Sequence, residues 1–187
     1  MNARTVIAPE WVRDVLEFWF EELGEPGWFA RRDAIDEAIR TRFRGLHDRL
    51  ATGNGVDDTD PRQVLAAVIV LDQFSRHIFR GTPQAFATDP IARRLARQAI
   101  ERGLDLQMTH AERLFVYLPF EHSEDRQDQA LSVHLFGQLG NENWTRYALA
   151  HQSIIDRFGR FPHRNSILGR TSTPDELAIL DDPMGTF

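Results

Sequence analysis

The sequence predicts an all-α protein of seven or eight helices packed as antiparallel hairpins. Three observations predict this fold class. Apolar residues recur at helical spacing along most of the chain. Helix-start signals precede these stretches, in the form of Asp-Pro pairs and Thr-x-x-Glu capping boxes. No segment shows the apolar–polar alternation of a strand.

Each predicted helix begins at a proline or a capping residue, and most end at a glycine. In the first half the predicted helices run from Pro9 to Gly24, from Asp33 to Gly53 and from Asp60 to Gly81. In the second half they begin at Asp89, at Thr109 and near Asp125, span Glu142 to Phe158, and begin again at Thr173.

The spacing of the helix starts indicates helical hairpins. Starts near residues 89, 109, 125 and 142 pair with an offset of about 34 residues, the period of tetratricopeptide hairpins. The side-chain signature of that repeat is poor, and short antiparallel helices in any bundle give similar offsets. No linker divides the chain. We therefore expect one domain over residues 1–187, with residues 171–187 as a loosely attached C-terminal helix and tail.

The composition excludes several kinds of chemistry. The 187 residues include no cysteine and no lysine, and the 22 basic residues are all arginine. Thiol nucleophiles, cysteine zinc sites, lysine Schiff bases and phosphate-loop lysines are therefore excluded. The formal net charge of −6 argues against a nucleic-acid partner. No two histidines are four residues apart and no phosphate-binding glycine loop is present, so we predict neither metal nor cofactor.

The chain carries no sign of a membrane partner. The longest unbroken apolar run, Val64 to Leu71, is far below the roughly 18 residues that span a bilayer. The N-terminal segment has only a short apolar stretch before Pro9 and does not resemble a signal peptide. We expect the protein to be cytoplasmic.

Asp72 interrupts the apolar stripe of its helix, so its carboxylate should point toward the core. Arg76 lies four residues on, within reach of a charge-assisted pair, and His77 and Arg80 continue the polar strip. One interpretation is a structural Asp–Arg pair that clamps the helix end, because buried charges are normally paired. The other is an edge that binds an anion.

Two further positions combine histidine with a buried setting. Glu121 and His122 follow a helix that Pro119 is expected to kink, so a carboxylate, an imidazole and a freed carbonyl should lie close together. They suit acid–base chemistry, although a merely polar helix end is the alternative. His151 falls on the apolar face of its helix, where a histidine is usually a satisfied core residue.

The segment RFGRFPHRN at 157–165 concentrates hydrogen-bond donors around a helix end. Guanidinium forks suit carboxylate or phosphate, whereas a structural role would satisfy helix C-terminal carbonyls and acidic side chains. The candidates for ligand binding in this segment are Arg157, Arg160, His163, Arg164 and Asn165.

Four blocks of sequence together resemble the bacterial family known as domain of unknown function 924. The resemblance covers nearly the whole chain and implies an all-α fold related to tetratricopeptide-like right-handed superhelices, in cytoplasmic proteins. It implies no activity. The resemblance leads us to expect an apolar residue before His122, whereas this sequence has Glu121 there. The blocks are VLEFWF at 15–20, LDQFSRHIFRGTPQAFATDP at 71–90, YLPFEHSEDRQDQ at 117–129 and RFGRFPHRNSILGRTSTPDE at 157–176.

Two classes of function remain open. A binding module would hold an anionic small molecule or an acidic peptide in a pocket lined by arginine and histidine. An enzyme would use His122, His151 and Asp72 for acid–base chemistry on an anionic substrate. The oligomeric state is not predicted. If the protein is a binding module, the candidate ligand-binding residues are Arg76, Arg80, Arg157, Arg160, His163, Arg164 and Asn165.

Overall fold

The computed structural model describes residues 8–180, and helices of all kinds cover roughly two-thirds of the chain. No strand forms within the described residues, so the all-α prediction is confirmed. The first half contains α1 (Glu10–Leu16), the π-helical η1 (Glu17–Leu23), α2 (Glu25–Trp28), α3 (Asp33–Leu50), α4 (Pro61–Val68), the π-helical η2 (Ile69–Phe74), α5 (Ser75–Ile78) and the 3₁₀ turn η3 (Pro83–Phe86). The second half contains α6 (Asp89–Glu101), the 3₁₀ turn η4 (Asp105–Gln107), α7 (His110–Glu121), α8 (Arg126–Gln138), α9 (Glu142–Phe158), the 3₁₀ turn η5 (Pro162–Arg164) and α10 (Pro174–Leu180).

If a π-helical turn is counted with the helix it extends, residues 8–180 form nine helical stretches, one or two more than the predicted seven or eight. One stretch that the sequence analysis did not anticipate is the single turn α2. It starts directly after Gly24, where we expected the chain to leave the helix. The indole Nε1 of Trp28 donates to the carbonyl of Trp19 at 2.8 Å, which fixes this turn against η1.

Most predicted helix starts are confirmed at atomic detail. Asp60 accepts from two backbone N–H groups of α4, and Thr109 forms the predicted capping box with Glu112. Asp33 and Asp89 differ from the prediction, because each is the first helical residue and not the cap. The carboxylate of Asp89 is thereby left free to bind another group.

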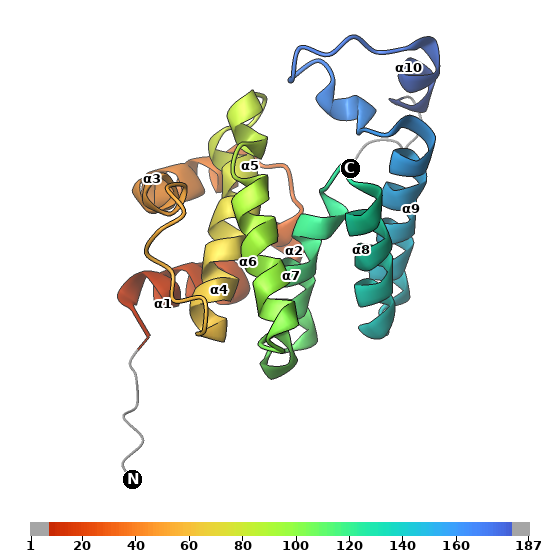
Figure 1. Cartoon of the computed structure of the whole chain (residues 1–187). Helices are drawn as coiled ribbons and strands as arrows, with labels where there is room; N and C mark the ends of the chain where they lie inside the picture. Colours follow the sequence, from red (N-terminus) through yellow and green to blue (C-terminus); the bar gives the residue numbers. More distant parts are fainter. Residues whose placement is uncertain (1–7, 181–187) are drawn as a thin grey trace.

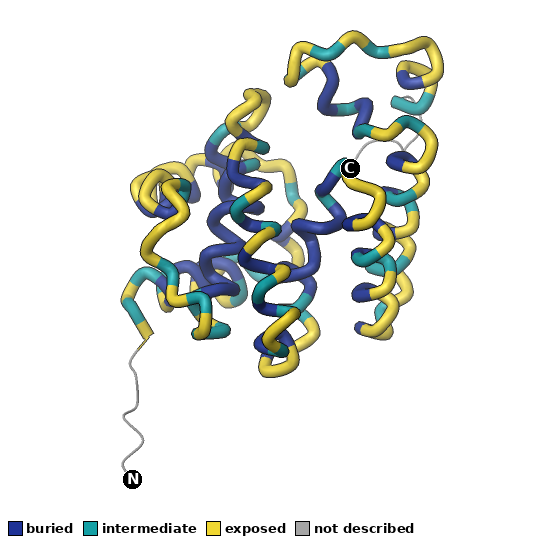
Figure 2. Tube along the Cα trace, viewed as in Figure 1, coloured by how far each residue is buried: buried dark blue, intermediate teal, exposed yellow. Residues whose placement is uncertain are grey.

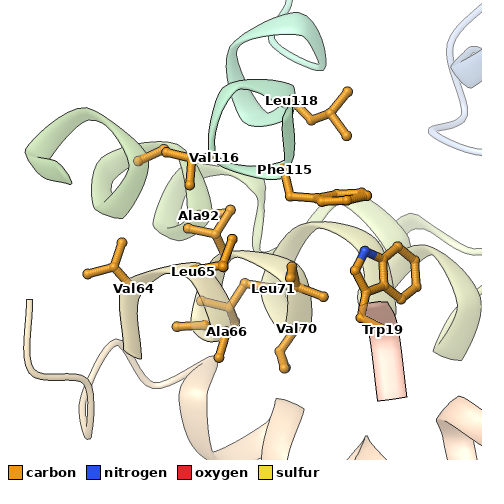
Figure 3. Close-up of a cluster of buried hydrophobic side chains, with 14 of the residues drawn as sticks. Trp19, Val64, Leu65, Ala66, Val70, Leu71, Ala92, Phe115, Val116 and Leu118 are labelled. Carbon is orange, nitrogen blue, oxygen red and sulfur yellow. The ribbon is translucent and has the colours of Figure 1, made fainter. Parts of the chain in front are cut away.

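The helix from Pro61 to Ile78 forms the centre of the molecule. Every residue from Val64 to Leu71 has no measurable exposure, as expected for a helix that is apolar on all sides. Its middle turn, η2, is π-helical, and single π-helical turns within α-helices are frequent at functional sites. Figure 3 shows this buried helix packed beneath Phe115 and Val116 of α7 and beside Trp19 of η1.

Successive helices of the second half pack side by side, α6 on α7, α7 on α8 and α8 on α9 (Figure 1). The buried residues run as one band through the central helices and into the facing sides of α8 and α9 (Figure 2). A separate small apolar cluster, centred on Ile154, Ile155 and Phe161, lies where α9 ends. A right-handed tetratricopeptide-like superhelix stays a prediction.

The C-terminal segment is held through side chains. Arg160 donates to both oxygens of Glu176 in α10 at 2.6 and 2.8 Å, and Glu176 also accepts from the backbone of Thr173. Residues 181–187 of the predicted tail lie outside the described residues. Within residues 8–180, none of the helices has the length and apolar character needed to cross a membrane.

Candidate functional site

Eight ionisable side chains from six segments gather around the C-terminal end of α7. They come from η2, α5, α6, α7 and the residue after it, α9 and η5, which are far apart in the sequence. We call this set the polar cluster: Asp72, Arg76, Asp89, Glu121, His122, His151, His163 and Arg164.

Asp72 is the buried anchor of the polar cluster. Its side chain has no exposed surface, and the π-helical turn η2 carries it. One carboxylate oxygen lies 2.9 Å from Nδ1 of His122 and 3.2 Å from a guanidinium nitrogen of Arg76, and the other accepts from Gln73 at 2.5 Å. Burial alone would raise the pKa of Asp72, but Arg76 and His122 outweigh it and hold the pKa well below its ordinary value. Asp72 is therefore ionised at neutral pH.

Arg76 bridges two carboxylates. Besides the contact with Asp72, its guanidinium donates to both oxygens of Asp89 at 3.0 and 3.2 Å. The charge of Arg76 is therefore fully compensated inside the protein. This arrangement is the structural pair that the sequence suggested for Asp72 and Arg76, extended by a second acid.

His122 has one ring nitrogen engaged and the other available. Because its Nδ1 donates to the ionised Asp72, the lone pair resides on Nε2. Nε2 forms no hydrogen bond with any of residues 8–180, and the side chain keeps 16% of its surface exposed. Burial lowers the pKa of His122 more than Asp72 raises it. The ring is therefore neutral at pH 7 and presents a basic nitrogen.

Glu121 and His151 form a neutral pair. A carboxyl oxygen of Glu121 lies 3.3 Å from Nδ1 of His151, which donates to the carbonyl of Tyr147 at 2.9 Å. Burial, together with the charge of Asp72, raises the pKa of Glu121 to about 8. Burial lowers the pKa of His151 to about 3. The cluster thus contains a carboxylic acid, Glu121, and a neutral imidazole, His151. The ring centres of His151 and His122 are 6.4 Å apart.

Arg164 is the least compensated charge in the polar cluster. Its guanidinium lies between the rings of Phe86 and Phe161, at 4.6 Å from each ring centre. The nearest acid is Asp89 at 3.9 Å, and the guanidinium forms no hydrogen bond with any described residue. Burial and the neighbouring Arg76 lower the pKa of Arg164 to about 10, so the group stays charged at pH 7.

Two further candidates of the 157–165 segment flank Arg164. His163 packs against Phe161 with ring centres 5.5 Å apart, and burial lowers the pKa of His163 to about 3. Asn165 is fully buried and its amide donates to Ser172 at 3.0 Å. His163 therefore lies beside the cluster as a neutral ring, and Asn165 braces the loop that carries it.

The comparison with known proteins agrees with this fold. The family described as bacterial protein of unknown function (DUF924) matches residues 15–184. The chain belongs to this family. A solved structure titled as a protein of unknown function, ATU0120 from Agrobacterium tumefaciens, is 39% identical, covers 91% of this chain and 97% of its own, and superposes with a TM-score of 0.86. No curated protein matches the chain. The resemblance drawn from the four sequence blocks is thereby confirmed.

Three arginines proposed from sequence lie elsewhere in this DUF924 protein. Arg80 binds both oxygens of Asp36 in α3, at 2.5 and 2.7 Å. Arg157 is exposed, with its guanidinium 4.7 Å from the ring centre of Phe158, and Arg160 binds Glu176. The five predicted arginines therefore do not form one pocket, because local carboxylates and an aromatic ring hold three of them. Arg76 and Arg164 are the two that meet.

Sequence reasoning missed Gln129, which holds the end of α7 in place. Its buried amide nitrogen donates to the carbonyls of Glu121 and Ser123 at 2.7 Å each, and to that of Phe120 at 3.4 Å. Carbonyls at a helix C-terminus have no partner within the helix, so this side chain satisfies the carbonyl of Glu121 together with that of Ser123, two residues beyond the helix. The available signal was a glutamine on the inner face of α8, at the end of the third sequence block that carries the family resemblance. By fixing this turn, Gln129 positions His122.

Replacing Gln129 by leucine should lower the free energy of unfolding by about 2 kcal/mol, because buried carbonyls lose their donor. Gln138→Leu is the matched control, since Gln138 is exposed on the same helix and should change stability by less than about 0.5 kcal/mol. Urea unfolding followed by circular dichroism measures both. Equal stabilities of the two variants would show that Gln129 does not hold this turn.

Proposed function

We propose that this DUF924 protein binds a small anion at the polar cluster, on the guanidinium of Arg164. The observation that carries the proposal is the state of Arg164: a charged group, nearly buried, with five N–H donors and no hydrogen-bond acceptor among the described residues. A buried cation without such partners is costly. An anion that accepts those hydrogen bonds would stabilise the folded protein.

The distribution of charge supports the same conclusion. The cluster contains two carboxylates, and both Asp72 and Asp89 lie within hydrogen-bond distance of Arg76, whereas Asp89 lies 3.9 Å from Arg164. Glu121 and the three histidines are uncharged at pH 7, so none of them compensates Arg164. A negatively charged ligand would compensate the charge of Arg164.

The geometry favours a small molecule over an acidic peptide. Only 8% of the Arg164 side chain is exposed, and Phe86 and Phe161 cover both faces of its guanidinium. A ligand therefore reaches the edge of the guanidinium alone. Carboxylate and phosphate oxygens match that edge with two parallel hydrogen bonds.

Sulfate is the probe for this proposal, because it carries the charge and oxygen geometry of the expected ligand. We expect isothermal titration calorimetry at constant ionic strength to show sulfate binding to the native protein, and Arg164→Met to weaken it at least tenfold. Arg157→Met, which removes an exposed arginine outside the cluster, should bind sulfate as the native protein does. Identical affinities in all three proteins would refute the proposal.

A second candidate function is acid–base catalysis on the bound anion. The Asp72–His122 pair favours it, because a carboxylate that holds Nδ1 and a neutral, available Nε2 are the parts of a general base. Glu121, uncharged at pH 7, could return a proton. The test is exchange of carbon-bound hydrogen for deuterium in a panel of small carboxylates, followed by NMR. His122→Asn should abolish exchange while sulfate still binds; exchange at the native rate in this variant excludes the role.

A further inference from the structure

A cavity between α6 and the end of α3 includes no residue of the polar cluster. Here the C-terminal end of α3, the loop after it and α6 enclose a half-open cavity of about 100 Å³. Leu50 of α3, Leu71 of η2 and Leu95 of α6 form its apolar bottom, and each of these side chains is at least nine-tenths buried. Apolar cavities of this order bind small apolar groups.

Arg94 lies at the mouth of this cavity with an uncompensated charge. Its terminal nitrogen is 3.5 Å from the point that a Cβ on Gly53 would occupy, so the guanidinium extends over the turn that follows α3. Gly53 has φ +80°, a conformation that favours glycine. Arg94 has no ion pair or side-chain hydrogen bond with any of residues 8–180.

The acids of the neighbouring loop are already engaged. Asp57 accepts from the backbone and the hydroxyl of Thr59 at 3.0 and 2.6 Å. Asp58, which lines the cavity, pairs with Arg102 at 2.9 Å. Asp60 caps α4. None of the three pairs with Arg94, so Arg94 is the lining cation to which no described acid is bound.

We propose that this cavity binds a short aliphatic carboxylate, with its alkyl chain against the partly exposed Val56 and Ile91 and its carboxylate on Arg94. The amide of Gln98 lines the same rim and can donate a second hydrogen bond. The volume accommodates a chain of about three or four carbons. The charge selects a carboxylate over an amine, because a cationic head group would meet Arg94. This site is independent of the anion site at Arg164.

Butyrate is the probe, with n-butylamine as its counterpart of opposite charge. In ¹H–¹⁵N correlation spectra, butyrate should shift signals of Leu50, Gly53 and Leu95 with a dissociation constant on the order of 1 mM, as expected for so few atoms. Butylamine should cause no saturable shift there. Arg94→Gln should weaken butyrate binding at least fivefold, and Arg157→Gln should leave it unchanged.

Two further variants separate this site from the first one. Ile91→Phe places a larger side chain at the partly exposed lining of the cavity and should abolish the butyrate shifts. Arg164→Met should leave them unchanged, even though it removes sulfate binding at the polar cluster. Equal shifts with butyrate and butylamine, or native butyrate affinity in Arg94→Gln or Ile91→Phe, would overturn the inference whatever the outcome at Arg164.

Discussion

Replacing Asp72 by asparagine is expected to lower the free energy of unfolding by about 3 kcal/mol, because removing one partner of a buried charge pair leaves the other uncompensated. Asp72 is fully buried and faces both Arg76 and His122. Asparagine preserves the size of the side chain, so the decrease in stability measures the effect of removing the negative charge. Chemical denaturation at pH 7 measures it.

The same substitution should also change how the stability of the protein depends on pH in acid. The pKa of Asp72 is lower in the folded protein than in the unfolded chain, so its stabilisation is present above the unfolded pKa of about 4 and disappears as the pH falls below it. The difference in the free energy of unfolding between native protein and Asp72→Asn should therefore become smaller toward pH 3. Asp48→Asn removes an exposed acid paired with Arg44 and should change stability by less than about 0.5 kcal/mol. Equal stability of the two variants at pH 7 would contradict the role of Asp72.

Glu121→Gln is expected to stabilise the protein in mild alkali, by about 5 kcal/mol at pH 8 to 9. The pKa of Glu121 is about 8 in the folded protein, whereas an unfolded glutamate titrates near 4.3. Between these values the folded state holds a proton that the unfolded chain has lost, so stability falls by up to about 1.4 kcal/mol per pH unit. Glutamine remains neutral and avoids this loss.

The pH at which the two proteins differ is the decisive feature. Native protein and Glu121→Gln should have similar free energies of unfolding at pH 5 and should diverge steadily up to pH 8, in urea titrations at each pH. Glu21→Gln, on the exposed surface of η1, should follow the native curve throughout. Parallel curves for native protein and Glu121→Gln would mean that Glu121 is ionised in the folded state.

The helices were predictable because their signals are local. Apolar period and capping residues place α3, α9 and the helix from Pro61 to Ile78 to within a few residues, and the capping box at Thr109 appears as predicted. The assembly of Asp72, His122 and His151 could also be anticipated, because each interrupts an apolar stripe and buried polar groups require partners.

The partners of the arginines were not predictable because they depend on tertiary packing. Arg80 binds Asp36, which is 44 positions away, and nothing near either residue signals the contact. Asp89 was interpreted as a helix cap, although its carboxylate binds Arg76. The π-helical turn that carries Asp72 departs from the helical period assumed for that segment. The lack of an acceptor for Arg164 among residues 8–180 likewise follows from packing that the sequence does not show.

The side-chain ¹⁵N spectrum of His122 tests the central claim, namely that Asp72 holds a neutral His122 ring in the same polar cluster as the guanidinium of Arg164, which takes an anion. At pH 7 without sulfate, we expect Nδ1 protonated and Nε2 unprotonated. A bound anion favours the charged ring, so sulfate should move the Nε2 signal toward the imidazolium position. This shift should occur in the native protein and in Arg157→Met, and be lost in Arg164→Met. A His122 that is already charged without sulfate, or that does not respond to it, would contradict the account.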